Sequence, residues 1–144
     1  MSRPLYETSA NLSNEQSVAG LIEKRWNVKL QKLPISYKVD FCAVRGKEVV
    51  AWMEIKCRNH PAGQYPTLML SVLKWQAGIQ LHQSTSAPLF LVARFACGTI
   101  LYAEAILTDV EVEYGGRTAQ TRDSADVEPV VMIPVKAMKE IVWK

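Results

Sequence analysis

Residues 37–58 constrain the possible folds more than any other segment of this chain. Their sequence is YKVDFCAVRGKEVVAWMEIKCR, in which two apolar runs flank a short polar stretch, Arg45-Gly46-Lys47. Apolar runs of this kind around a glycine-containing turn predict a β-hairpin. We therefore expect a sheet that contains this hairpin.

Charged residues interrupt the hairpin at positions where apolar residues would be easier to bury. In a hairpin without bulges whose turn is centred on Lys47, Asp40 lies directly opposite Glu54. Side chains paired in this way have Cβ atoms about 4.5–5.5 Å apart. Because strand side chains alternate, Lys56 projects from the same face as Glu54, whereas Ile55 points to the other face. The three charges are thus predicted to share one small volume.

Such a group of charges has a chemical use. Two carboxylates placed so close repel each other unless a cation or a proton intervenes. Magnesium prefers one or two carboxylates completed by water and phosphate, and a neighbouring lysine can orient or deprotonate the attacking water or stabilise phosphate charge. The set therefore suits metal-assisted phosphodiester hydrolysis. The alternative is an ordinary solvated strand edge, because an E-x-K tripeptide is common.

The composition is that of one globular domain over residues 1–144, with 49% apolar and 22% charged residues. The longest apolar run, Ala87–Cys97, is broken by Arg94 and falls short of the roughly 20 residues that span a membrane. The N-terminal sequence has no apolar segment of the kind found in signal peptides. We expect a cytoplasmic protein without a membrane partner.

The cysteines and the net charge narrow the classes of site. Cys42, Cys57 and Cys97 form no CxxC pair and are too few for a disulfide framework, so reduced thiols are expected. Two histidines do not favour a histidine-rich zinc site, which leaves carboxylates as the ligands of any metal. The net charge of +3 permits a polyanionic partner without requiring one.

The remaining sequence alternates between helical and extended patterns. A capping box at Ser13 followed by apolar residues at helical spacing predicts a helix over about Asn14–Trp26. The further predicted elements are a strand over Val28–Leu33, a loop over Asn59–Pro66, a helix over about Thr67–Gln83, strands over Pro88–Ala93 and Thr99–Leu107, a polar loop or hairpin tip over Asp109–Glu128, a strand over Val130–Ile133 and a closing helix from Pro134 through Val142. This order predicts an α/β (α+β) fold with a central mixed sheet flanked by helices.

The pattern of Asp40, a turn and then Glu54-Ile55-Lys56 at the end of an apolar strand resembles the PD-(D/E)XK nuclease superfamily. The archaeal Holliday-junction-resolvase-like and phage-type members are the most similar. The resemblance implies a restriction-endonuclease-like fold, with a helix before the hairpin and a helix and an apolar strand after it. One departure is that Val39 stands where the family name has proline.

The resemblance also implies a set of site residues. Asp40 and Glu54 would ligate Mg²⁺ or Mn²⁺, Ile55 would offer its backbone carbonyl, and Glu15 on the first helix would complete the catalytic site. Lys56 would act on the attacking water or on the phosphate. Glu23 is the rival of Glu15 on the same helix, although its position is more typical of a surface residue.

Several polar residues near this motif are candidates for contacts with DNA. They are Lys74, Arg58, Lys47, His60 and Gln76. Each also has a simpler interpretation as a solvated surface residue or, for His60, as an ordinary loop histidine. Gln76 belongs to a polar stripe on the predicted second helix and faintly resembles a glutamine motif of some of these nucleases. Junction-resolving enzymes of this kind usually act as symmetric dimers, so the resemblance also implies a homodimer.

The sequence thus favours a metal-dependent DNA endonuclease, with selectivity for branched DNA as one form of it. The resemblance implies a bacterial cell or a phage-infected host as its setting. An alternative is a catalytically inactive subunit that keeps the nuclease fold for nucleic-acid binding or assembly. In a third interpretation, a non-nuclease interaction domain, Asp40→Asn would raise stability and change nothing else. The intact set of Asp40, Glu54 and Lys56 favours the first hypothesis, because a retired site has no reason to keep an unfavourable carboxylate pair.

Overall fold

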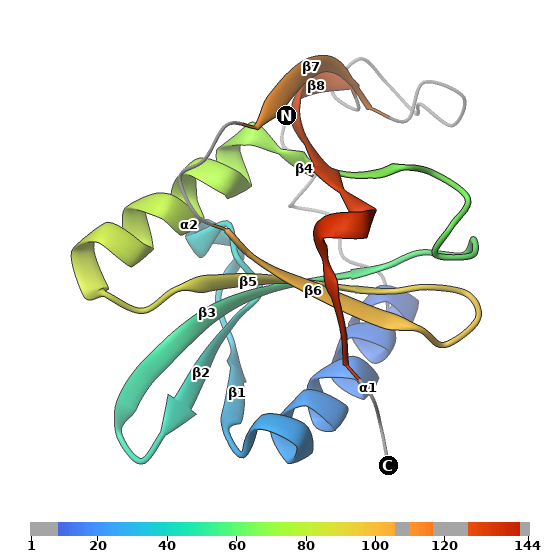
Figure 1. The fold of residues 1–144 in the computed structure, drawn as a ribbon. Coiled ribbons are helices and arrows are strands. Elements are labelled where there is room, and N and C mark those ends of the chain that lie inside the picture. The colour runs from blue at the N-terminus through green and yellow to red at the C-terminus, as the bar shows by residue number, and fades with distance from the viewer. Residues whose placement is uncertain (1–8, 106–109, 117–126, 142–144) are drawn as a thin grey trace.

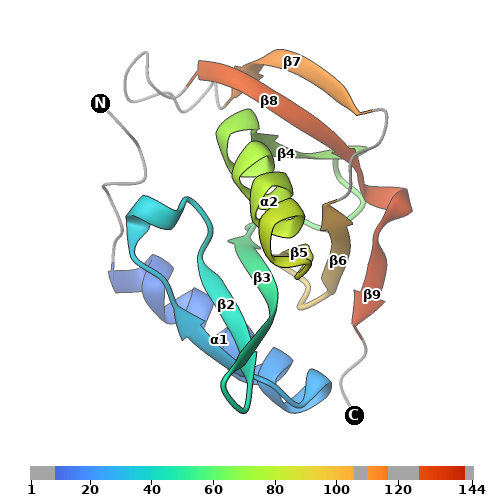
Figure 2. The same cartoon turned by 90° about the vertical axis from the view of Figure 1, so that its left-hand side faces the viewer.

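The computed structural model describes residues 9–105, 110–116 and 127–141, which form two sheets and two α-helices (Figures 1 and 2). The larger sheet has six strands in the order β1-β2-β3-β5-β6-β9, and the smaller has the order β4-β8-β7. The bounds are α1 Ser9–Trp26, β1 Lys29–Lys32, η2 Ile35–Tyr37, β2 Phe41–Arg45, β3 Glu48–Cys57, β4 Thr67–Ser71, α2 Val72–Thr85, β5 Leu89–Arg94, β6 Ile100–Ala105, β7 Glu111–Gly116, β8 Val127–Pro134, η5 Val135–Ala137 and β9 Lys139–Ile141.

The larger sheet is mixed, as predicted, because β3 and β5 are parallel and its other neighbouring strands are antiparallel. The connection from β3 to β5 carries α2, which is the crossover that a parallel pair requires. The two helices cover opposite faces of this sheet, as Figure 2 shows. Val18 and Ile22 of α1 pack on Met53 of β3, whereas Trp75 of α2 packs with Leu89 on the other side.

The predicted hairpin is present, but the expectation that it lacks a bulge was wrong. Arg45 pairs with Glu48 around the turn, where Gly46 has a φ of +68° that a glycine adopts readily. The register shifts after Ala43, and Val50 is the extra residue of a β-bulge. Beyond the bulge, Phe41 pairs with Met53, which is the register that the bulge-free hairpin centred on Lys47 assumed.

The packing of α2 on the sheet depends on a glycine. Gly78 is buried, and a Cβ at this position would collide with the side chain of Leu89 in β5. The helix therefore lies close against the sheet. Farther along, the Trp52 indole N–H donates to the hydroxyl of Thr85 at 3.1 Å. These contacts fix the position of the helix relative to β3, which decides where its first turn lies.

Three of the predicted elements need correction. The helix predicted over Thr67–Gln83 begins only at Val72, because residues 67–71 form strand β4, in which Leu68 and Leu70 alternate with less buried residues. Leu68 lies four residues before Val72, which is followed by Trp75 and Ile79, and this spacing is typical of the buried face of a helix. The strand residue Leu68 matches it only by coincidence. Ser71 ends the strand and caps α2, since its Oγ accepts the backbone N–H of Leu73 at 3.2 Å.

The prediction of a closing helix from Pro134 was also wrong. In its place, η5 is a single 3-10 turn and β9 adds to the edge of the larger sheet, where Ile141 pairs with Ile100. The apolar residues Val135, Met138 and Ile141 have helical spacing, yet they pack in two different clusters. The first helix begins at Ser9 rather than near Asn14, so Ser13 is not its N-cap.

The remaining predictions agree with the structure in type. The polar segment 109–128 includes β7 and the start of β8, and residues 117–126 between them lie outside the described part of the chain. Cys42, Cys57 and Cys97 are free thiols. Within residues 9–105, 110–116 and 127–141, no helix is long and apolar enough to cross a membrane.

Candidate active site

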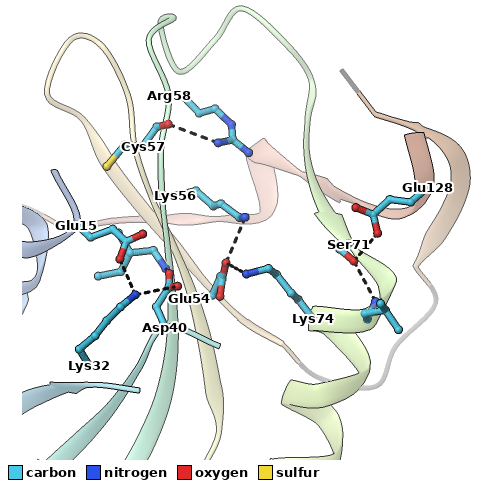
Figure 3. Close-up of polar contacts among 12 residues, drawn as sticks. Glu15, Lys32, Asp40, Glu54, Lys56, Cys57, Arg58, Ser71, Lys74 and Glu128 are labelled. Atoms are coloured by element: carbon cyan, nitrogen blue, oxygen red, sulfur yellow. Dashed lines mark hydrogen bonds and ion pairs between the residues drawn. The ribbon is translucent and has the colours of Figure 1, made fainter. Parts of the chain in front are cut away.

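The site lies where the start of β2 meets the second half of β3, close to α1 and to the first turn of α2 (Figure 3). Asp40 immediately precedes β2, and its backbone N–H donates to the carbonyl of Met53 at 3.1 Å. Its carboxylate Oδ2 accepts the backbone N–H of Ile55 at 2.9 Å. The hairpin backbone therefore both places Asp40 and orients its side chain.

Glu54 occupies the centre of the larger sheet and is only 1% exposed. Its Oε2 lies 3.2 Å from Nζ of Lys56 and 2.8 Å from Nζ of Lys74, as Figure 3 shows. Its Oε1 is buried and has no hydrogen-bond partner among the residues that the structure describes. An unsatisfied buried carboxylate oxygen is costly, and such atoms in folded proteins commonly mark a functional site or a bound ion.

A third carboxylate approaches from α1. Glu15 Oε1 accepts from Nζ of Lys32 at 3.0 Å, and the same Nζ lies 3.6 Å from Oδ1 of Asp40. Lys32 stands at the end of β1 in register with Phe41, the residue that follows Asp40. Lys32 thus links Glu15 to Asp40, and the predicted approach of a helix glutamate to the motif is present in the geometry (Figure 3).

The ionisation of the site reflects this crowding. Burial raises the pKa of Asp40 to about 6, and the nearby charges of Glu54 and Glu15 add to the rise. Burial lowers the pKa of Lys56 from its ordinary value, against the attraction of Glu54. For Lys74, burial acts in the same downward direction, but the carboxylates of Glu54, Asp40 and Glu15 outweigh it and raise the pKa.

The donor set fits a hard divalent cation. Asp40 and Glu54 supply carboxylate oxygens, and no described residue hydrogen-bonds to the Oε1 atom of Glu54. Within the described residues, no three side chains of His, Cys, Asp or Glu converge in a ready-made metal cage. Magnesium does not need such a cage, because it usually keeps several waters and binds through one or two carboxylates together with substrate phosphate.

The predicted DNA-contacting residues fall into two groups, one near the site and one away from it. Lys74 belongs to the site itself, through its contact with Glu54. Arg58 follows β3 directly; its backbone N–H donates to the carbonyl of Arg94 at 2.8 Å, and its charge contributes to the lowered pKa of Lys56. Lys74 therefore lies at the carboxylates, and Arg58 lies near Lys56.

The other three candidates lie away from the carboxylates. Lys47 is exposed at the hairpin turn, nine strand residues from Lys56, or roughly 30 Å. The ring of His60 packs against Tyr65 at 4.9 Å between ring centroids and lies in the loop after β3. Gln76 is on α2 and lines a shallow apolar pocket beside Val112 and the smaller sheet.

Two features of the site were not found by sequence reasoning. Lys32 was not singled out, although its position in the strand just before the hairpin, in reach of Asp40, was an available signal. The contact of Lys74 with Glu54 depends on how α2 packs, which no local pattern encodes. Glu23, the rival of Glu15, accepts the backbone N–H of Leu30 at 2.8 Å and so joins α1 to β1.

Comparisons with known proteins agree with this geometry. The chain is similar in structure to Archaeoglobus fulgidus Hjc, a Holliday junction resolvase from an archaeal hyperthermophile, with a TM-score of 0.60 at 14% sequence identity over 92% of this chain and 93% of that chain. This likeness shows a shared fold. No curated protein matches the chain. Residues 1–141 match the family model described as "Phage putative PDDEXK endonuclease". The predicted PD-(D/E)XK assignment is thereby confirmed, and the chain belongs to this family of phage PDDEXK endonucleases.

Proposed function

We propose that this protein is a metal-dependent DNA endonuclease that uses Mg²⁺ or Mn²⁺. The observation that carries the proposal is the buried Glu54 carboxylate. Within the described part of the chain its Oε1 has no hydrogen-bond partner, whereas its Oε2 is held by Lys56 and Lys74. A buried acceptor left in this state is explained if it is a ligand of a cation. Membership of a PDDEXK endonuclease family supports phosphodiester hydrolysis as the reaction.

Each residue of the site has a role in this proposal. Asp40 and Glu54 would hold the cation, with the backbone carbonyl of Ile55 and the carboxylate of Glu15 as further ligands. A divalent cation bound there supplies Lewis acidity and makes bound water more acidic. Lys56, which is half-buried beside Glu54, would orient the attacking water or donate to a phosphate oxygen as negative charge develops.

The proposed substrate is branched DNA. The support is the fold shared with a Holliday junction resolvase over nearly the full length of both chains. A junction has two strands to cut in related geometry, which a symmetric homodimer would match. Arg58 would place positive charge near the scissile phosphate.

The test is a cleavage assay with labelled four-way junction, flap, single-stranded and linear duplex DNA in Mg²⁺ or Mn²⁺. We expect cleavage that requires the metal and prefers the branched substrates. Lys56→Ala and Glu54→Gln should each reduce the rate by at least about 100-fold. Lys24→Met changes an exposed lysine on α1 and is the matched control.

The outcomes separate the alternatives. Cleavage that survives both substitutions would reject this site as the catalytic one. DNA binding without cleavage of any substrate would instead indicate an inactive nuclease-fold subunit for binding or assembly. Cleavage of all substrates at equal rates would keep the endonuclease and reject selectivity for branched DNA. Analytical ultracentrifugation with and without a junction tests the homodimer.

A further inference from the structure

Two lysines from different parts of the fold share one oxygen of Glu54. Lys56 comes from the same strand, two residues along β3, and Lys74 comes from the first turn of α2. Both ammonium groups lie against Oε2, at 3.2 and 2.8 Å (Figure 3). Across residues 9–105, 110–116 and 127–141, Oε1 finds no hydrogen-bond partner. The E-x-K motif accounts for Lys56 alone. Lys74 has no role in that motif, although its contact with Glu54 is the shorter one.

We propose that Lys74 is a positioning residue, which holds Oε2 of Glu54 so that Oε1 is presented to the divalent cation and Lys56 is free to act on the substrate. The inference rests on the proposed function and assigns Lys74 a task within it. Lys74 acts through Glu54 rather than on the reacting atoms. This assignment replaces the sequence-based hypothesis that Lys74 is primarily a contact to DNA phosphate.

The first reason is orientation. A carboxylate with a single donor from its own strand keeps freedom to rotate about the Cγ–Cδ bond. A second donor from α2, on the same oxygen, restrains this rotation, because rotation would break both contacts. Groups around a metal ligand commonly fix its orientation in this way, and removing them typically costs 10- to 100-fold in metal affinity or activity.

The second reason is charge. Glu54 is almost fully buried, and a buried carboxylate without a counterion is costly. Lys56 can therefore move away from Glu54 only if another cation stays in contact with it. If Lys56 were the only lysine in contact with Glu54, its movement towards a phosphate would leave the buried carboxylate without a side-chain counterion. Lys74 removes this conflict.

The third reason is that the first turn of α2, from which Lys74 projects, is held in place by contacts with other parts of the fold. Ser71 caps the helix through the N–H of Leu73 and donates its own hydroxyl to Glu128 of β8 at 2.9 Å. At the middle of the helix, Gly78 allows close packing on Leu89. The backbone from which Lys74 projects is therefore fixed by both sheets, which a positioning residue requires.

The test compares Lys74→Met with Lys24→Met on α1, an exposed lysine in the same type of secondary structure. The first readout is the rise in melting temperature with increasing Mn²⁺ in the absence of DNA. We expect Lys74→Met to raise the half-saturating Mn²⁺ concentration by about tenfold or more, with Lys24→Met unchanged. Glu54→Gln should abolish the Mn²⁺ response.

The second readout is kinetic. Lys74→Met should lower kcat for junction DNA while KM and the salt dependence of DNA binding stay within about twofold of the parent. A residue that contacts phosphate would behave in the opposite way, with weaker DNA binding, a salt slope reduced by about one, and an unchanged Mn²⁺ response. That result would overturn the inference.

The two proposals fail in distinguishable ways. A parent protein that shows no Mn²⁺ response and no cleavage would overturn both the metal-dependent function and the role of Lys74. A parent that responds to Mn²⁺ through Glu54 while Lys74→Met responds equally well would overturn the role of Lys74 alone. Lys74→Gln keeps a hydrogen-bond donor and removes the charge. It gives the same comparison, with the same expected direction, if Lys74→Met does not fold.

Discussion

Asp40 and Glu54, the two carboxylates of the site, are held by different means. Asp40 is fixed by its own hairpin, through the backbone N–H of Ile55 and through its own N–H to Met53. Glu54 is held by two lysine side chains, of which Lys74 comes from a helix outside the hairpin. One half of the site is local in sequence, and the other half depends on tertiary packing.

The two carboxylates also differ in how well lysine side chains balance their negative charges. Glu54 has two ammonium groups in contact, whereas Asp40 has Lys32 at 3.6 Å, shared with Glu15. Burial, together with the nearby charges of Glu54 and Glu15, accordingly raises the pKa of Asp40 to about 6. We infer that, without a metal, the negative charge of Asp40 is electrostatically unfavourable, whereas that of Glu54 is balanced by its two lysines. Neutralising each carboxylate should therefore have opposite effects on stability.

The largest expected effect is this difference in sign. In EDTA at pH 7.5, Asp40→Asn should raise the free energy of unfolding by roughly 2–3 kcal/mol, because it removes a buried charge and keeps an acceptor for Ile55. Glu54→Gln should lower it by roughly 1–3 kcal/mol, since Lys56 and Lys74 lose their counterion. Urea unfolding of both variants measures the contrast. Shifts of the same sign would show that the two halves do not differ in this way.

The second prediction concerns pH in the metal-free protein. The pKa of Asp40 is raised from 3.8 to about 6 on folding, so between these values the folded state binds more protons than the unfolded state. The free energy of unfolding therefore falls as pH rises through this window, by roughly 3 kcal/mol from Asp40. Asp40→Asn should lack this contribution. The measurement is the difference between the parent and variant curves from pH 4 to 7, and parallel curves would contradict it.

The local half of the site was predictable from sequence because the hairpin encodes it. Alternation placed Glu54 and Lys56 on one face, and the register placed Asp40 opposite Glu54. The predicted strand register is present, although the turn is not centred on Lys47 as assumed. The bulge at Val50 shifts the pairing by one residue, so that beyond it the strands pair as predicted. The motif also carried the family, which the match over residues 1–141 confirms.

The tertiary half could not be predicted in the same way. Lys74 reaches Glu54 only because residues 67–71 are a strand, so that α2 starts at Val72 and its first turn faces the site. The helical spacing of Leu68 with later apolar residues hid this strand. Likewise, β9 was mistaken for a helix, since three apolar residues with helical spacing fit either a helix or a turn followed by an edge strand. Gly78 inside a helix was a readable sign of close packing.

The third prediction uses Gly78 to disturb the tertiary half alone. Gly78→Ala would place a Cβ against Leu89 and displace α2 from β5, which should cost about 1–3 kcal/mol of stability. Because Lys74 moves with the helix, the Mn²⁺ response of Glu54 should weaken as well. The matched control is Gly20→Ala in α1, where a Cβ meets no atom of the described residues within 4 Å and alanine favours the helix. Equal effects of the two substitutions would argue against this dependence on α2.

The smallest expected effect concerns the link from α2 to the smaller sheet. The Oγ of Ser71 has one proton, which it donates to Glu128, and this orients its lone pairs towards the N–H of Leu73. Glu128→Ala removes the acceptor and should cost about 0.5–1.5 kcal/mol in thermal or urea unfolding, whereas Glu128→Gln keeps an acceptor and should stay within about 0.5 kcal/mol of the parent.

The same substitution reports on the mechanism of the tertiary half. If Glu128 acts on the site through the position of Lys74, then Glu128→Ala should weaken the Mn²⁺ response slightly in the parent and hardly at all in a Lys74→Met background. Additive effects in the double variant would mean that the smaller sheet influences Glu54 by another route. The backbone N–H that orients the Asp40 carboxylate belongs to the hairpin, so the fall in stability between pH 4 and 6 should be the same in Glu128→Ala as in the parent.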